Sequence, residues 1–167
     1  KGEEFQTKPT KYDYFDFVQY QLKMGDIEKQ KEQCFWKEQF LIFPEVINLY
    51  YEHKNASAYC RRFAQNEFKF DNSIYGELQN LSLKSNTDLL QICTAILYVL
   101  LIRYTGQHDF CISIPVSGRE IKEYETVRGP FETLIPVRIT TGDDASFSNV
   151  LEDVKNAVSL SLSNQNS

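Results

Sequence analysis

The stretch LLQICTAILYVLLIRYTGQHDFCISIPVSGR, residues 89–119, places a long apolar helical run directly before an apolar strand-like run. The helical part is apolar nearly all round, which predicts a buried central helix over residues 87–104. Ser85 and Asp88 have capping-box spacing before it, and Gly106 stands just past its end. The run FCISIPV, residues 110–116, predicts a strand that Gly118 closes in a turn.

Apolar periodicity predicts further elements on both sides of this stretch. A helical pattern over residues 12–40 breaks at Gly25 and Asp26, with Asp26 as the expected N-cap of the second helix. The remaining expected elements are a strand over 62–70, a helix over 73–83, a strand over 134–140 in one sheet with 110–116, and a helix that begins after Ser146. Helices that alternate with strands indicate the α/β class.

Composition narrows the class of protein. The chain has 167 residues, enough for one domain or one lobe of a larger one, and a net charge of −5 argues against nucleic-acid binding. The N-terminus has no apolar signal region, and the apolar run from Ile92 is too short to cross a bilayer, so we expect a cytoplasmic protein. No CxxC pair occurs in the sequence. The cysteines are expected to be buried free thiols; they are Cys34, Cys60, Cys93 and Cys111.

Known catalytic motifs are missing from the sequence. It contains no GxSxG elbow, P-loop or GxGxxG, and local spacing assembles no metal site. Two pairs of carboxylates, Asp13 with Asp16 and Asp143 with Asp144, are interpreted as a solvated helix face or an anionic helix cap. His53 is expected at the surface and His108 in a structural role.

Four segments together carry a family resemblance. RYTGQ followed by an apolar strand and PVSGR, residues 103–119, resembles the condensation domains of nonribosomal peptide synthetases, which carry RYTGQ and PVxGR in this arrangement. GPFETLIPVR, residues 129–138, resembles their motif GxFVNTLPLR. YFDFVQY, residues 14–20, is similar to YxDYAVW, and FWKEQ, residues 35–39, is similar to YWREQL. Their order and spacing agree, from about residue 12 to the end.

The chain also departs from the family pattern. In an ungapped alignment the family's Val-Asn-Thr falls on Glu132, Thr133 and Leu134, and Tyr20 replaces a Trp. Residues 118–120 and 132–137 are similar to the related epimerization domains as well. The catalytic motif HHxxxDG does not occur; in the family it precedes YxDYAVW, and the later HQDxPFE motif would begin at about Ser163. We therefore expect a central piece, with residues 1–11 as a linker or frayed end and 12–167 as most of the C-terminal lobe.

The resemblance implies a fold, an activity and partners. The implied fold is one chloramphenicol-acetyltransferase-like lobe, a mixed sheet flanked by helices. The implied activity is amide formation between two thioesters on the phosphopantetheine arms of donor and acceptor carrier proteins, with no cofactor or metal bound to the chain itself. The expected partners are these carriers and the first lobe of the same domain, and neither nucleic acid nor membrane.

Two further hypotheses about function remain open. This chain would supply channel wall and carrier-docking surface without the catalytic His, so it is expected to be inactive alone. It could instead be a stand-alone noncatalytic binding or scaffold lobe, or a fragment of an epimerization domain. A natural start near Lys1 would favour a stand-alone lobe, and an upstream HHxxxDG would favour the condensation domain.

Ten residues are candidates for the site or its scaffold. The expected substrate-channel residues are Ser117, Arg119, Glu132 and Thr133. The expected structural residues of the family motifs are Tyr14, Asp16, Gly118, Gly129, Phe131 and Arg138.

Each candidate has a plainer interpretation beside the functional one. Arg119 is either a channel-wall or interlobe charge, or the partner of a carboxylate such as Glu120, Glu123 or one elsewhere. Glu132 and Thr133 either line a channel or lie on plain strand surface. Gly118 and Gly129 are expected to adopt positive φ.

An apolar face is also expected to be exposed. The expected contributors are Tyr12, Tyr14, Phe17 and residues 131–135, where a first lobe would otherwise pack. Such a face predicts self-association of the chain.

Overall fold

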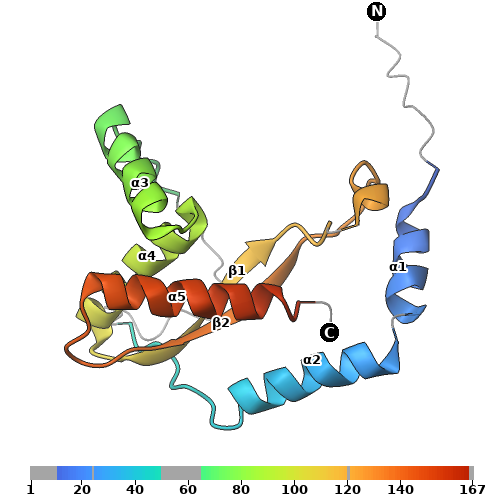
Figure 1. Ribbon diagram of the computed structural model, residues 1–167, viewed down its shortest axis with the longest axis horizontal. Coiled ribbons are helices and arrows are strands. Elements are labelled where there is room, and N and C mark those ends of the chain that lie inside the picture. The colour runs from blue at the N-terminus through green and yellow to red at the C-terminus, as the bar shows by residue number, and fades with distance from the viewer. Residues whose placement is uncertain (1–10, 24, 50–64, 120, 166–167) are drawn as a thin grey trace, which may run out of the picture. The chain divides into compact units, whose positions relative to one another are not determined.

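The computed structural model describes residues 11–23, 25–49, 65–119 and 121–165. Its elements are α1 (Tyr14–Lys23), α2 (Asp26–Gln39), α3 (Asn72–Ser85), α4 (Leu89–Thr105), β1 (Asp109–Val116), the 3-10 helix η1 (Lys122–Tyr124), β2 (Thr133–Thr140) and α5 (Phe147–Leu162) (Figure 1). This mixture of helices and strands confirms the predicted α/β class.

The two predicted strands do form one sheet. β1 and β2 pair as an antiparallel two-stranded sheet. The described residues contain this one sheet. The chain divides into two compact units. The first unit comprises Lys1–Phe43, Ile112–Val137 and Leu160–Ser167, and the second comprises Pro44–Cys111 and Arg138–Ser159.

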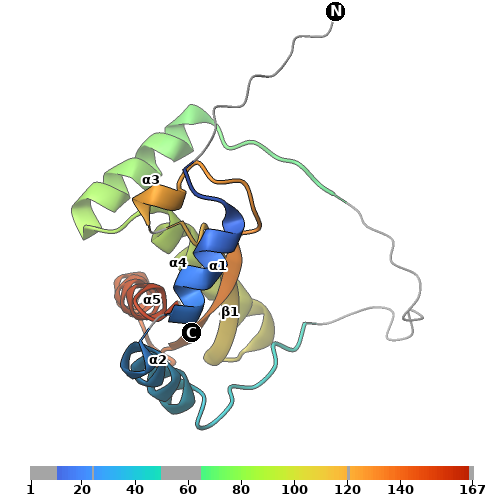
Figure 2. The same ribbon diagram turned by 90° about the vertical axis from the view of Figure 1, so that its right-hand side faces the viewer.

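The core of the first unit is an aromatic cluster between α1 and the segment that contains η1. Its buried members are Phe17, Tyr124, Val127 and Phe131, with Tyr12, Tyr14 and Ile121 packed against them. Figures 1 and 2 show α1 beside η1. The prediction that Tyr12, Tyr14 and Phe17 form an exposed patch is therefore wrong, because they pack in this cluster against the loop before β2; Phe15 and Tyr20 of α1, outside the predicted patch, are 66% and 47% exposed. Among the apolar residues of the predicted patch, Leu134 is the one that is mostly exposed, at 66%.

The core of the second unit centres on Tyr98 of α4. Its side chain is fully buried, and its ring stacks on Phe110 with centroids 4.5 Å apart. The hydroxyl lies within hydrogen-bond distance of two carbonyl oxygens, at 2.6 Å from His108 and 3.0 Å from Ile139. Burial raises the pKa of the Tyr98 hydroxyl, so it remains a donor. One buried side chain thus joins α4 to the backbone just before β1 and to the backbone of β2.

The end of α4 agrees with its predicted capping signal, whereas its capping box begins three residues later than predicted. Asp88 is the N-cap, and its carboxylate accepts from the Gln91 backbone N–H at 2.7 Å. The Gln91 side chain accepts from the Asp88 N–H at 3.1 Å, so the capping box is Asp88 with Gln91 and lies three residues after the predicted box of Ser85 with Asp88. Gly106 ends the helix with a φ of 69°, as predicted.

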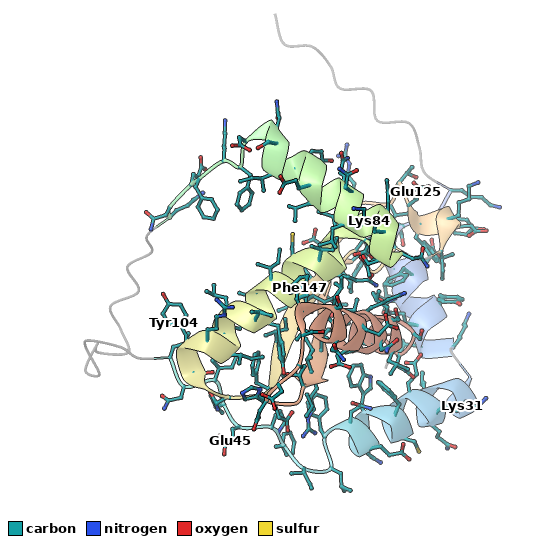
Figure 3. All side chains as sticks on the ribbon, turned by 60° about the vertical axis from the view of Figure 1, so that its left-hand side comes forward. Lys31, Glu45, Lys84, Tyr104, Glu125 and Phe147 are labelled. Atoms are coloured by element: carbon teal, nitrogen blue, oxygen red, sulfur yellow. The ribbon has the colours of Figure 1, made fainter. Side chains whose placement is uncertain are left out.

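α4 is not buried on all sides, which corrects the sequence-based expectation. Ile92, Ala95 and Tyr98 are fully buried, whereas Leu97 and Leu100 on another face are 44% and 49% exposed. Figure 3 labels Tyr104, near the exposed end of this helix. Apolar composition shows that a helix can be buried, but neighbouring elements decide how many of its faces are covered.

Three other expectations need correction. Residues 65–70 form no strand, and Phe68 and Phe70 are mostly exposed; residues 62–64 of that predicted strand lie outside the described residues. Asp26 is the first residue of α2, and Gly25 is its N-cap without a side-chain bond. Cys34 and Cys93 are exposed free thiols, Cys111 is half-buried, and Cys60 lies outside the description.

The last helix agrees with its predicted pattern. The Ser146 hydroxyl oxygen accepts from the Asn149 backbone N–H at 3.3 Å and caps α5. The buried face carries the expected spacing, with Val150, Leu151, Val154 and Val158. No single helix among the described residues is long and apolar enough to span a bilayer; only α3 and α4 taken together, across a bend of 103°, reach such a length and composition.

Candidate functional site

A groove in the first unit brings several predicted residues together. It has a volume of about 430 Å³ and runs along α1, past the loop before β2, to the start of that strand. Its lining residues are Tyr14, Phe17, Val18, Gln21, Leu22, Gly118, Pro130, Phe131, Glu132, Thr133 and Gln165. Glu132 and Thr133, two of the four channel candidates, therefore lie in one groove, whereas Ser117 and Arg119 do not line it.

α1 presents Tyr14 to the groove because its first turn is fixed. The Asp13 carboxylate accepts from the Asp16 N–H at 3.0 Å, and the Asp16 carboxylate accepts from the Asp13 N–H at 2.9 Å. Both carboxylates are exposed, so the pair forms a helix cap and also lies on a solvated helix face, the two interpretations given above. The Tyr14 hydroxyl donates to the Pro130 carbonyl at 3.3 Å, and its ring meets Phe131 edge-on at 5.1 Å.

Arg119 holds the loop that forms one wall of the groove. Its Nη1 donates to the carbonyl oxygens of Val127 at 2.6 Å, Tyr124 at 2.9 Å and Glu125 at 3.4 Å. The guanidinium carbon lies 3.9 Å from the centre of the Phe131 ring. Figure 3 labels Glu125 in this loop. Arg119 thus bonds backbone carbonyls instead of pairing with Glu123, and Glu120 lies outside the described residues.

The two motif glycines serve the groove in different ways. Gly118 has a φ of 59°, in the left-handed region, as predicted, and a Cβ there would overlap the Phe131 carbonyl. Gly129 has no positive φ, so that part of the prediction is wrong. A Cβ on Gly129 would instead overlap the ring of Tyr14. Gly129 is therefore required by the close approach of an aromatic side chain.

Arg138 forms an ion pair within the second unit. Its guanidinium donates to both oxygens of Asp109, from Nε at 2.9 Å and from Nη2 at 2.6 Å. The Thr140 hydroxyl donates to Asp109 Oδ1 at 3.0 Å. The hydrogen bond from Arg138 holds the pKa of Asp109 below its usual value. This bidentate pair supports the structural role expected for Arg138.

A smaller hollow in the second unit surrounds His108. It has a volume of about 260 Å³ and lies between the end of α4 and the start of α5, where Figure 3 labels Phe147. His108 Nε2 is 3.8 Å from an Asp143 carboxylate oxygen, and Nδ1 has no hydrogen-bond partner. Among the residues that the structure describes, no group of three His, Cys, Asp or Glu could hold a metal ion. His53 lies outside the described residues.

Sequence reasoning missed part of the groove. Val18 and Gln21 stand four and seven residues after Tyr14, so a helical face that includes Tyr14 also presents them. That signal was available in the sequence. Gln165 was not predictable in this way, because no local pattern relates the end of the chain to α1.

Curated relatives are large peptide synthases. The chain is 27% identical over 143 residues to tyrocidine synthase 3 of Brevibacillus parabrevis, a match that covers 85% of the chain and 2% of that protein. It is 24% identical over 165 residues to surfactin synthase subunit 1 of Bacillus subtilis strain 168, which covers 99% of the chain and 4% of that protein. The chain thus spans a small fraction of the length of these relatives.

Solved structures with a similar fold include a condensation domain and an X-domain. The first condensation domain of the CDA synthetase gives a TM-score of 0.78 at 19% identity, over 96% of this chain and 36% of that one. The X-domain from teicoplanin biosynthesis, solved in complex with OxyB, gives 0.85 at 20% identity, over 97% and 37%. These similarities confirm the predicted chloramphenicol-acetyltransferase-like fold.

The family follows from the whole chain and not from one motif. A protein-family model described as "Condensation domain" matches residues 1–167. This match includes the four segments in which the resemblance was found, and three of them contribute residues to the groove. The chain therefore belongs to the condensation domain family.

Proposed function

We propose that this chain forms part of a nonribosomal peptide synthetase condensation domain and supplies one wall of its substrate channel. In this proposal the domain joins two aminoacyl or peptidyl thioesters carried on phosphopantetheine arms of donor and acceptor carrier proteins. The observation that carries the proposal is the groove of the first unit. There the motif residues Tyr14, Gly118 and Phe131 meet the channel candidates Glu132 and Thr133.

The proposed reaction is an acyl transfer to nitrogen. The acceptor amine attacks the donor thioester carbonyl, a C–N bond forms, the C–S bond breaks, and the carrier thiol leaves with the proton. Because the motif HHxxxDG is not in this sequence, the proposed role of the chain's own residues is to bind and orient the two thioester substrates. Holding two tethered reactants in position replaces a bimolecular encounter, which lowers the entropic part of the activation free energy.

Cysteine crosslinking tests whether the groove receives a carrier arm. The protein, expressed from its own reading frame with its native cysteines replaced by alanine, receives Thr133→Cys in the groove. A carrier protein whose phosphopantetheine ends in a haloacetamide should alkylate this thiol on the order of ten times faster than a free haloacetamide-pantetheine does, because docking raises the local concentration.

The matched control is Ser148→Cys, on the exposed side of α5 and outside the groove. It should react with the carrier no faster than with the free reagent. Equal carrier-dependent rates at Thr133→Cys and Ser148→Cys would exclude the groove as the place where the arm enters.

A second candidate function is a noncatalytic lobe that binds another protein. The X-domain with a similar fold was solved in complex with OxyB, which favours keeping this candidate. The two functions differ in the product formed. The assay uses the protein encoded by the complete natural reading frame and both carriers loaded with substrate. This protein should form an amide if it contains a condensation domain, and no amide if it is a binding lobe.

A further inference from the structure

The hollow around His108 combines apolar walls with exposed charges of both signs. Two side chains that are ionised at neutral pH line it. Arg103 is exposed in the last turn of α4, and the side chain of Asp143, in the turn before α5, is 92% exposed. The apolar lining comes from α4 and from the first turn of α5, and consists of Val99, Ile102, Phe147 and Val150. All these residues belong to the second unit, and none of them lines the groove of the first.

Both charges are available to a ligand. Arg103 forms no ion pair with the described residues, and the ion pair that Asp143 forms among them is the one with His108. That contact is long, at 3.8 Å, and joins opposite charges only while the imidazole is protonated. A guanidinium group favours a carboxylate, and the Asp143 carboxylate favours an ammonium group. The hollow therefore matches a molecule that carries both groups.

The walls of the hollow set the size and polarity of that molecule. The volume of about 260 Å³ lies below the range of about 300–1,000 Å³ that is typical of drug-sized ligands, so it suits a smaller one. Val99 and Ile102 are half-buried and Phe147 is 39% exposed, so part of their apolar surface faces water. An apolar group that covers this surface stabilises the complex. The ligand therefore has a small apolar part beside its two charges.

We propose that this hollow binds a free α-amino acid with a branched aliphatic side chain. Its carboxylate pairs with Arg103, its ammonium group pairs with Asp143, and its side chain lies against the apolar wall. The site goes beyond the proposed function, because an aminoacyl thioester has no free carboxylate and lacks one of the two charges. The plainer interpretation is that Arg103 and Asp143 only complement the dipoles of α4 and α5 at the ends where they stand.

Four small molecules separate the contributions to binding. L-leucine carries both charges and the side chain, 3-methylbutylamine lacks the carboxylate, 4-methylpentanoate lacks the ammonium group, and glycine lacks the side chain. NMR titration of the full chain follows the imidazole signals of His108, which a His53→Gln variant distinguishes from those of the other histidine. Leucine should bind about threefold more tightly than either single-charge analogue, as expected for exposed ion pairs, and about tenfold more tightly than glycine.

Two variants should change these preferences in opposite ways. Arg103→Gln should remove the preference for leucine over 3-methylbutylamine and keep the preference over 4-methylpentanoate, whereas Asp143→Asn should do the reverse. Arg128→Gln and Asp144→Asn alter exposed charges outside the hollow and should keep both preferences. If Arg103→Gln and Asp143→Asn lower stability but leave both preferences intact, the two charges serve only the helix ends and the proposal is overturned.

The unaltered chain gives a decision even where a variant fails to fold. Equal binding of leucine and both single-charge analogues would overturn the proposal, and so would leucine binding that leaves the His108 signals unmoved. The probes contain no thioester and need no carrier protein, so this result is independent of the crosslink at Thr133→Cys. A failed crosslink with an intact leucine preference would count only against the proposed function, and the reverse result only against this inference.

Discussion

Arg119 was a candidate for a charge in the substrate channel, but its hydrogen bonds hold the backbone of a loop. Its Nη1 approaches the carbonyls of Val127 and Tyr124, and its plane lies over Phe131. Guanidinium groups suit this position because they donate several bonds and also stack on rings. The loop that Arg119 holds leads to Glu132 and Thr133, so its effect on the groove is one of positioning.

Replacement of Arg119 by Met should destabilise the first unit. The substitution keeps most of the stem but removes the donors to buried carbonyls, a loss of about 1–3 kcal/mol in the free energy of unfolding. Urea denaturation followed by fluorescence measures it. Arg128→Met, an exposed arginine in the same loop, is the control and should change stability by less than about 0.5 kcal/mol. Equal effects of the two substitutions would show that the carbonyl bonds contribute nothing.

The Asp109–Arg138 pair gives the stability of the second unit a pH dependence. The folded protein holds the pKa of Asp109 below its unfolded value, chiefly through the Arg138 hydrogen bond. A depressed pKa stabilises the fold above the unfolded pKa of about 3.9, and that contribution is lost as the pH falls through the folded pKa. Unfolding at pH 7, 5 and 3 should show Asp109→Asn less stable than the unaltered chain at pH 7 and 5.

The difference between the two proteins should shrink towards pH 3. The control is Asp144→Asn, an exposed carboxylate in the turn before α5, which should track the unaltered chain at every pH. A gap that stays constant from pH 7 to pH 3 would mean that Asp109 stabilises through shape and not through its charge.

At the scale of elements, local signals placed most ends of helices and strands to within a few residues, although the N-caps predicted for α2 and α4 were wrong. Asp88 and Gly106 bracket α4, and Ser146 caps α5, because caps are set by side chains adjacent in sequence. The strand predicted over residues 65–70 was wrong for the opposite reason. A strand needs a hydrogen-bonded neighbour, and the described residues provide none for that segment. The prediction that α4 is buried on all sides was wrong for a similar reason, since periodicity does not specify which neighbours cover a helix.

The candidate site divides along the same line. Glu132 and Thr133 were predicted from a motif, and the structure places both in the groove. Arg119 was predicted from a motif as well, but its partners are carbonyls that no sequence pattern indicates. Gln165 joins the groove through tertiary contact alone.

Asp88→Ala should shorten or fray the start of α4. It removes a side-chain acceptor from the Gln91 N–H and should cost about 1 kcal/mol, whereas Asp88→Asn should cost much less. Thermal unfolding of the two variants gives the difference. Glu77→Ala on the exposed side of α3 is the control for loss of a carboxylate. If Asp88→Asn is as damaging as Asp88→Ala, the cap hydrogen bond is not the source of the stability.

At the scale of the whole molecule, family membership follows from four segments spread over the sequence and from a match to the full chain. Activity does not follow from it. The chain should form no amide bond between two loaded carriers when it is purified alone, because HHxxxDG is absent from the sequence and His108 contacts Asp143 in the second unit. A carrier-loading assay checks this by mass spectrometry of the product. Turnover above background that His108→Ala abolishes would assign His108 a catalytic role.

Self-association of the chain should arise from α4 and not from Tyr14 and Phe17 of α1. Phe17 is buried and Tyr14 half-buried, whereas Ile96, Leu97 and Leu100 are each nearly half exposed on one side of α4. Exposed apolar area is costly in water, and large exposed patches on a protein mark contact surfaces or aggregation sites. Light scattering should therefore show oligomers that grow with concentration, and Ile96→Lys with Leu100→Lys should reduce them. Asn80→Lys with Ser148→Lys adds the same charge at exposed polar positions, and an equal reduction there would make net charge, not the apolar face of α4, the controlling factor.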